Sequence, residues 1–147
     1  MQRGFSFIEL IVVISIILLA AALAVPRLGN SIAVRELEDA AQQLATDIRW
    51  TQQMVVNSDS NNLPILMFSN AVPYGYTITQ GTKIMKKHDF PASVNLTGNP
   101  GNLIFKINGI PASGSDFTIS LRSTGINQAR KVVIAMSTGR VRVEKSP

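Results

Sequence analysis

The sequence predicts an α+β protein in which a long N-terminal α-helix packs on a small antiparallel β-sheet head. Three observations predict this fold class: an unbroken apolar run near the N-terminus, apolar residues at helical spacing after it, and a change to two-residue alternation after Leu63. The 147 residues have room for one hydrophobic core, which excludes a multidomain enzyme.

The first element is the apolar run from Phe5 to Val25, in which Glu9 is the single charged residue. A helix over these positions spans about 30 Å, the thickness of the hydrocarbon core of a bilayer. We therefore predict one transmembrane helix at residues 5–25. A cleaved secretory signal peptide is the alternative, but the run is longer than such peptides use, and no convincing small-residue cleavage site precedes Pro26.

Glu9 distinguishes this segment from a simple membrane anchor. A carboxylate within lipid costs roughly 3 kcal/mol even on a lenient insertion scale, so it is expected to have a partner there. An ionisable residue in a membrane segment is a candidate functional residue.

The second element is an amphipathic helix over residues 26–57. Pro26 removes a helical hydrogen bond and crowds the preceding turn, so it predicts either a kink or break in one long helix or the end of the membrane helix. Trp50 and Met54 lie off the apolar stripe and are more typical of extra core than of a docking patch. Apolar or small residues recur every three or four positions, at Val34, Leu37, Ala41, Leu44, Ile48, Thr51 and Val55.

The third element is the β-rich head, at residues 63–147. Turn residues recur every eight to twelve positions there, and alternate residues of several segments are apolar, so each strand should have one buried face covered by the helix. The predicted strands are Ile65–Ser69, Tyr74–Thr79, Lys83–Lys86, Ser93–Leu96, Leu103–Asn108, Asp116–Arg122, Lys131–Ser137 and Arg140–Glu144.

The N-terminal residues Arg3-Gly4-Phe5-Ser6-Phe7-Ile8-Glu9-Leu10 closely resemble the N-terminus of type IV prepilins and type II secretion pseudopilins. The resemblance implies a pilin-like fold and a leader at residues 1–4. It also implies cleavage between Gly4 and Phe5 by a prepilin peptidase and N-methylation of Phe5. Glu9 would meet the terminal ammonium of a neighbouring subunit during assembly, which relieves two charges that are costly in lipid. Pro26 fits the position where pilin helices bend inside filaments.

The remaining chain resembles the GspH/FimT group of minor pilins and pseudopilins. The residues that carry the resemblance are Leu44–Val56, Phe105 with Gly109, and the terminal hairpin from Val132 to Val143. Trp50-Thr51-Gln52-Gln53 stands where that group often has Ala-Arg-Ser/Glu-Ala. The implied partners are other pilins, the prepilin peptidase and an inner-membrane assembly platform. The chain would wait in the inner membrane with its head outside the cytoplasm and then enter either a type IV pilus or a type II secretion pseudopilus.

Catalytic chemistry has little support in the sequence. The chain has no cysteine and one histidine, His88, which is expected in an exposed charged turn. Carboxylates lack the spacing of metal ligands, and no phosphate-binding glycine loop is present. We therefore predict no enzyme activity, no metal site and no cofactor.

The positive charge of the chain is concentrated near the C-terminus. From Arg122 onward there are six basic residues and one acidic residue, which equals the formal net charge of +5 of the whole chain. Arg140 and Arg142 should project together from one strand, and the arginine fork suits phosphate. Gly139 to Arg142 also resembles a Gly-Arg-x-Arg element associated with DNA uptake in some members of the GspH/FimT group. The candidate contacts to double-stranded DNA are Arg140, Arg142, Arg130, Lys131 and Lys145. The alternative is a solvated edge hairpin whose charges prevent edge-to-edge pairing.

Overall fold

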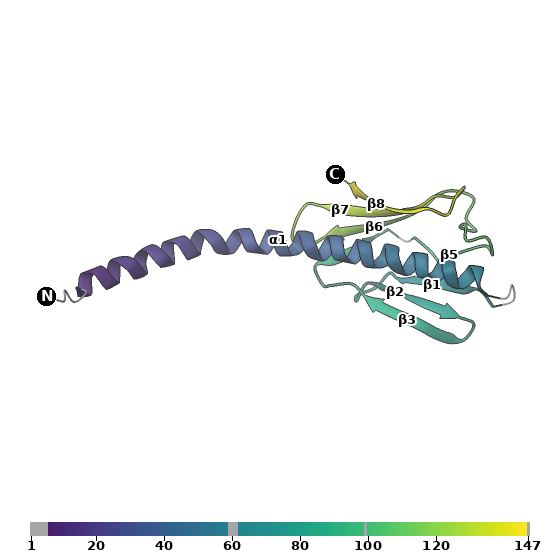
Figure 1. The fold of residues 1–147 in the computed structure, drawn as a ribbon, viewed down its shortest axis with the longest axis horizontal. Helices are drawn as coiled ribbons and strands as arrows, with labels where there is room; N and C mark the ends of the chain where they lie inside the picture. Colours follow the sequence, from purple (N-terminus) through teal and green to yellow (C-terminus); the bar gives the residue numbers. More distant parts are fainter. Residues whose placement is uncertain (1–5, 59–61, 99, 147) are drawn as a thin grey trace. The chain divides into compact units, whose positions relative to one another are not determined.

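The computed structural model describes residues 6–58, 62–98 and 100–146, except for the side chains of residues 23–28. It divides into two compact units, residues 1–32 and 33–147. The elements in chain order (Figure 1) are α1 (Phe7–Val56), β1 (Pro64–Ser69), β2 (Gly75–Gln80), β3 (Lys83–Asp89), β4 (Val94–Thr97), β5 (Leu103–Ile104), β6 (Phe117–Ser123), β7 (Ala129–Ile134) and β8 (Val141–Ser146). The predicted α+β class with antiparallel pairing is confirmed.

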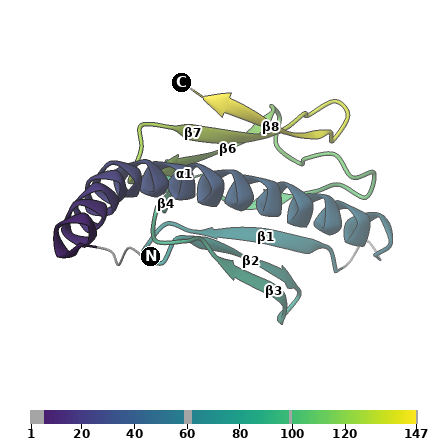
Figure 2. The same cartoon turned by 60° about the vertical axis from the view of Figure 1, so that its left-hand side comes forward.

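The head contains two antiparallel sheets, where the sequence led us to expect one. Sheet A has the strand order β3-β2-β1-β5, and sheet B has the order β4-β6-β7-β8. The part of α1 in the head lies between them, with β1–β3 on one side and β6–β8 on the other (Figure 2). The helix can face two sheets because its buried arc is broad and includes the small residues Ala40, Ala41 and Ala45, which let strands approach closely.

Each predicted strand has a counterpart in the structure. The prediction of Leu103–Asn108 was too long, because β5 ends at Ile104 and Phe105 instead forms an isolated bridge with Pro111. Ile107, which the alternation placed on the buried face, is 51% exposed in the turn that follows.

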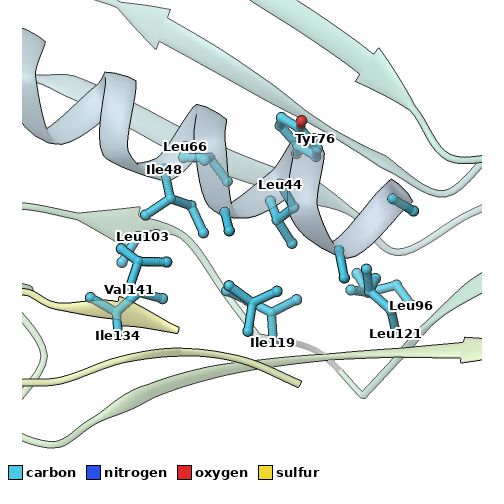
Figure 3. Close-up of a cluster of buried hydrophobic side chains, with 14 of the residues drawn as sticks. Leu44, Ile48, Leu66, Tyr76, Leu96, Leu103, Ile119, Leu121, Ile134 and Val141 are labelled. Atoms are coloured by element: carbon cyan, nitrogen blue, oxygen red, sulfur yellow. The ribbon is translucent and has the colours of Figure 1, made fainter. Parts of the chain in front are cut away.

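The core joins the helix to both sheets. Leu44 and Ile48 of α1 meet Leu66 of sheet A and Ile119 and Ile134 of sheet B (Figure 3), and all five are fully buried. Burying a side chain of this size stabilises the fold by about 1.5–3 kcal/mol relative to exposure. The helical stripe predicted from the sequence is therefore the centre of the head.

Asp47, a buried carboxylate, ties α1 to sheet A. It accepts hydrogen bonds from Tyr76 Oη at 2.6 Å, Lys86 Nζ at 2.7 Å and Gln43 Nε2 at 3.2 Å. Burial alone would raise the pKa of Asp47, but these three donors outweigh it and hold the pKa below its usual value. Burial and the neighbouring Asp47 charge raise the pKa of Tyr76 well above its usual value. The hydroxyl of Tyr76 therefore stays a donor.

His88 does not lie in a turn, and that prediction was wrong. It belongs to β3, opposite Tyr76, and is partly buried. The ring centroids of His88 and Tyr76 are 5.4 Å apart, and Phe90 packs on both rings. The neighbouring Lys87 and Asp89 are exposed because strand alternation sends them to the other face.

Candidate functional site

The N-terminal site begins with a capped helix. The backbone N–H of Ser6 donates to Glu9 Oε2 at 3.0 Å, and the N–H of Leu10 donates to the Ser6 carbonyl at 3.3 Å. Ser6 is therefore the N-cap of α1, and Glu9 is its third helical residue, in the reciprocal position of a capping box. This places the Glu9 carboxylate at the positive end of the helix dipole. The predicted cleavage site between Gly4 and Phe5 lies outside the described residues.

The described part of the apolar run exposes its large side chains. Phe7, Ile8, Ile16 and Leu19 are each more than 60% exposed. Within residues 6–58, 62–98 and 100–146, no helix is long and apolar enough to cross a membrane. The predicted span at residues 5–25 also includes Phe5 and the side chains of residues 23–25, which lie outside the described residues.

α1 continues through Pro26, so of the predicted kink, break or helix end, the break and the helix end are wrong. The surroundings of the Pro26 side chain lie outside the described residues.

Arg130 is the one candidate DNA contact that the fold places in the interior. It is 5% exposed, and its Nε donates to Glu38 Oε2 of α1 at 2.7 Å. This hydrogen bond holds the pKa of Glu38 below its usual 4.5. The strand pattern carried the signal for this, because Arg130 shares a face with the buried Val132 and Ile134. Arg130 therefore ties α1 to sheet B.

The other four candidate cations of the terminal hairpin are exposed, each in a different setting. Arg140 lies in the turn before β8, where its N–H donates to Thr138 Oγ1 at 3.3 Å. Arg142 Nε lies 2.5 Å from Glu144 Oε1, and both side chains are nearly half exposed. Lys145 pairs with Arg130 in the β7–β8 register and so points to the α1 side of sheet B.

Lys131 lies on the opposite, outer face of sheet B. The register places it directly across from Ser120 on one side and from Glu144 on the other. Arg122 lies on the same outer face, across from Asn95. Arg122 is a site residue that the sequence analysis missed. The signal was the alternation of the strand, in which Ile119 and Leu121 are buried and the following Arg122 points to the other face.

Gln52 of α1 helps to fix the turn that carries Arg140 to the rest of the head. Gln52 Nε2 of α1 donates to the carbonyls of Gly109, at 2.9 Å, and Gly139, at 2.7 Å. Gly139 has a φ of 67°, and a Cβ added there would lie 2.6 Å from the Gly109 carbonyl oxygen. Glycine is required at this position because two backbone segments meet there.

The site contains basic and hydrogen-bonding groups rather than a reacting constellation. Among the residues that the structure describes, no group of three or more histidine or acidic side chains is arranged to hold a metal ion. The basic side chains of the head can bind anions, and the Glu9 carboxylate at the N-terminal end of α1 can pair with a cation.

The prokaryotic N-terminal methylation motif matches residues 1–25. No curated protein matches the sequence. A solved structure, the type IV minor pilin FimU of Pseudomonas aeruginosa, matches the fold with a TM-score of 0.54 and 18% sequence identity, covering 76% of this chain and 93% of that one. The chain has a pilin fold with a prepilin-type N-terminus.

Proposed function

We propose that the chain is a minor pilin or pseudopilin. A prepilin peptidase cleaves it between Gly4 and Phe5, Phe5 is N-methylated, and the apolar segment holds the subunit in the inner membrane until it enters an extracytoplasmic filament. The observation that carries this proposal is the methylation motif at residues 1–25 on a chain with a pilin fold.

The processing step is tested by mass analysis of the protein from a host with an active prepilin peptidase. We expect the mass to lack residues 1–4 and to include one added methyl group on Phe5. A chain that keeps Met1 to Gly4 in such a host would contradict the proposal.

Glu9 is proposed to set the register of the subunit in the filament. Its carboxylate lies at the N-terminal end of α1, where it accepts a hydrogen bond from the N–H of Ser6, the residue that would follow the new terminal Phe5 in the cleaved chain. In the filament the ammonium of a neighbouring subunit would pair with it, because each charge is costly in lipid alone.

The test compares Glu9→Ala with Asp39→Ala, which removes an exposed acid of α1 in the head. We expect both variants to reach the membrane at normal levels. Incorporation of Glu9→Ala into sheared filaments should fall at least about tenfold, since an unpartnered buried charge costs several kcal/mol. Equal incorporation of the two variants would exclude this role for Glu9.

A second function, DNA binding by the head, is favoured by the exposed cations Lys131, Arg140 and Lys145. The full chain in detergent should bind a labelled DNA duplex at low salt. Arg140→Ala combined with Arg142→Ala should weaken binding equally for all sequences and lower the salt slope by about one, because Arg140 is exposed whereas Arg142 is held in an ion pair with Glu144. Absence of binding by the unmutated chain would rule out this function.

A further inference from the structure

The outer face of sheet B, which faces away from α1, carries two cations on neighbouring strands. Arg122 of β6 lies opposite Ala129 of β7, and Lys131 follows Ala129 by two residues on β7. Residues directly opposite in an antiparallel pair point to the same face, and diagonal neighbours lie about 7 Å apart. Arg122 and Lys131 therefore project side by side from this outer face.

Two hollows adjoin these cations. One, of about 180 Å³, is lined by Arg122 and Lys131 together with hydroxyl and amide side chains, among them Ser120, Asn127 and Gln128. The second, of about 540 Å³, shares Arg122 and Thr97 with the first and continues over β4. Among the described residues that line the two hollows, none is acidic. The face is thus a polar, positively charged groove.

The two cations of this groove are not held in ion pairs within the described part of the chain. Arg130 and Arg142, by contrast, each pair with a glutamate. Arg122 Nη2 donates to Asn127 Oδ1 at 2.8 Å, which orients the guanidinium and leaves its other donors available.

Resting on the proposed DNA-binding function, we propose that the outer face of sheet B, centred on Arg122 and Lys131, is the surface that holds the DNA backbone. Each cation contacts a phosphate, and the neighbouring hydroxyl and amide groups donate hydrogen bonds to phosphate and sugar oxygens. Contacts of this kind carry no base readout, so binding is independent of sequence.

Glu144 limits the same surface. It lies opposite Lys131 and pairs with Arg142, so it removes one cation from the face and repels phosphates near the other. Neutralising Glu144 should therefore extend the contact surface onto β8.

The experiment measures binding of the full chain in detergent to a fluorescent DNA duplex as a function of salt. Arg122→Ala with Lys131→Ala should weaken binding at least about tenfold at moderate salt and lower the salt slope by about two, since two phosphate contacts are lost. The control, Lys83→Ala with Lys87→Ala, removes the same charge from exposed positions of β3 in sheet A. It should change the affinity by less than about threefold.

A gain of binding gives an independent test that does not depend on a destabilised variant. Glu144→Gln keeps the size of the side chain and frees Arg142, so the salt slope should rise by about one and the affinity should increase. Unchanged or weaker binding by Glu144→Gln would overturn the proposal.

The outcomes separate this proposal from the function on which it rests. If the unmutated chain binds no DNA, both fail. If it binds and only Arg140→Ala with Arg142→Ala weakens binding, the sheet face is wrong and DNA binding stands. If the sheet B variant and the sheet A control lose DNA affinity equally, binding depends on general charge attraction, and the proposed site is overturned. Tighter binding of dextran sulfate than of DNA, with the same dependence on Arg122 and Lys131, would overturn the choice of DNA.

Discussion

Replacing Asp47 with alanine should destabilise the head by about 1–4 kcal/mol. The larger part comes from Tyr76, which is 1% exposed and donates its hydroxyl to Asp47. A buried hydroxyl left without an acceptor costs about 1–3 kcal/mol. The smaller part comes from Lys86, whose side chain is 38% exposed and can return to water, so its ion pair contributes at most about 1 kcal/mol.

The assay is urea unfolding of the full chain in detergent, followed by the fluorescence of Trp50, the single tryptophan of the chain. Three variants are compared: Asp47→Ala, Tyr76→Phe, and the two combined. Removing the hydroxyl removes the group that Asp47→Ala leaves unsatisfied, so the double variant should be more stable than the sum of the single effects predicts by about 1–2 kcal/mol. A loss below about 0.5 kcal/mol for Asp47→Ala, or additive single effects, would refute this account of the buried network.

Three further predictions concern two carboxylates, a glycine and a glutamine of the head. The pKa values of Glu38 and Asp47 are lowered in the folded chain, so their contribution to stability is fully present above the usual carboxyl pKa values of 4.5 and 3.8 and is lost as the pH falls through the lower folded values. The urea midpoint should therefore fall as the pH is lowered through that range, and it should fall less steeply in Asp47→Asn. Gly139→Ala should cost about 2–4 kcal/mol in the same assay, because the new Cβ meets the Gly109 carbonyl at a positive φ. Gln52→Ala should lower the free energy of unfolding by about 1–2 kcal/mol and raise the hydrogen-exchange rate of the amides in the Gly139 turn. An unchanged exchange rate would contradict this prediction.

Local periodicity predicted the helix and the place of each strand, although β5 was predicted too long and β3 too short. The apolar stripe from Leu37 to Val55 and the alternation of Ile119 and Leu121 are properties of neighbouring residues, and the structure buries all of these side chains. The division of the strands into two sheets depends on pairing between distant segments, such as β1 with β5, and no local pattern specifies it.

The candidate site was predictable only in part, for the same reason. Arg130 was mistaken for a surface residue although it alternates with the buried Val132 and Ile134, because its partner, Glu38, lies 92 residues away in the chain and no local pattern identifies it. His88 was assigned to a turn because its neighbours are charged, although two of them, Lys87 and Asp89, simply occupy the opposite face of the strand. Arg122 gained significance only when the register brought Lys131 beside it.

Two of the polar ties on α1, one to each sheet, have a mechanical consequence. Asp47 joins the helix to sheet A, and Glu38 joins it to sheet B through Arg130. Tension applied along the helix within the head is therefore shared between the sheets in parallel, and drawing the helix out must break both ties and the apolar packing together. In this shear geometry, pulling α1 out of the head requires a larger force than either sheet alone would resist.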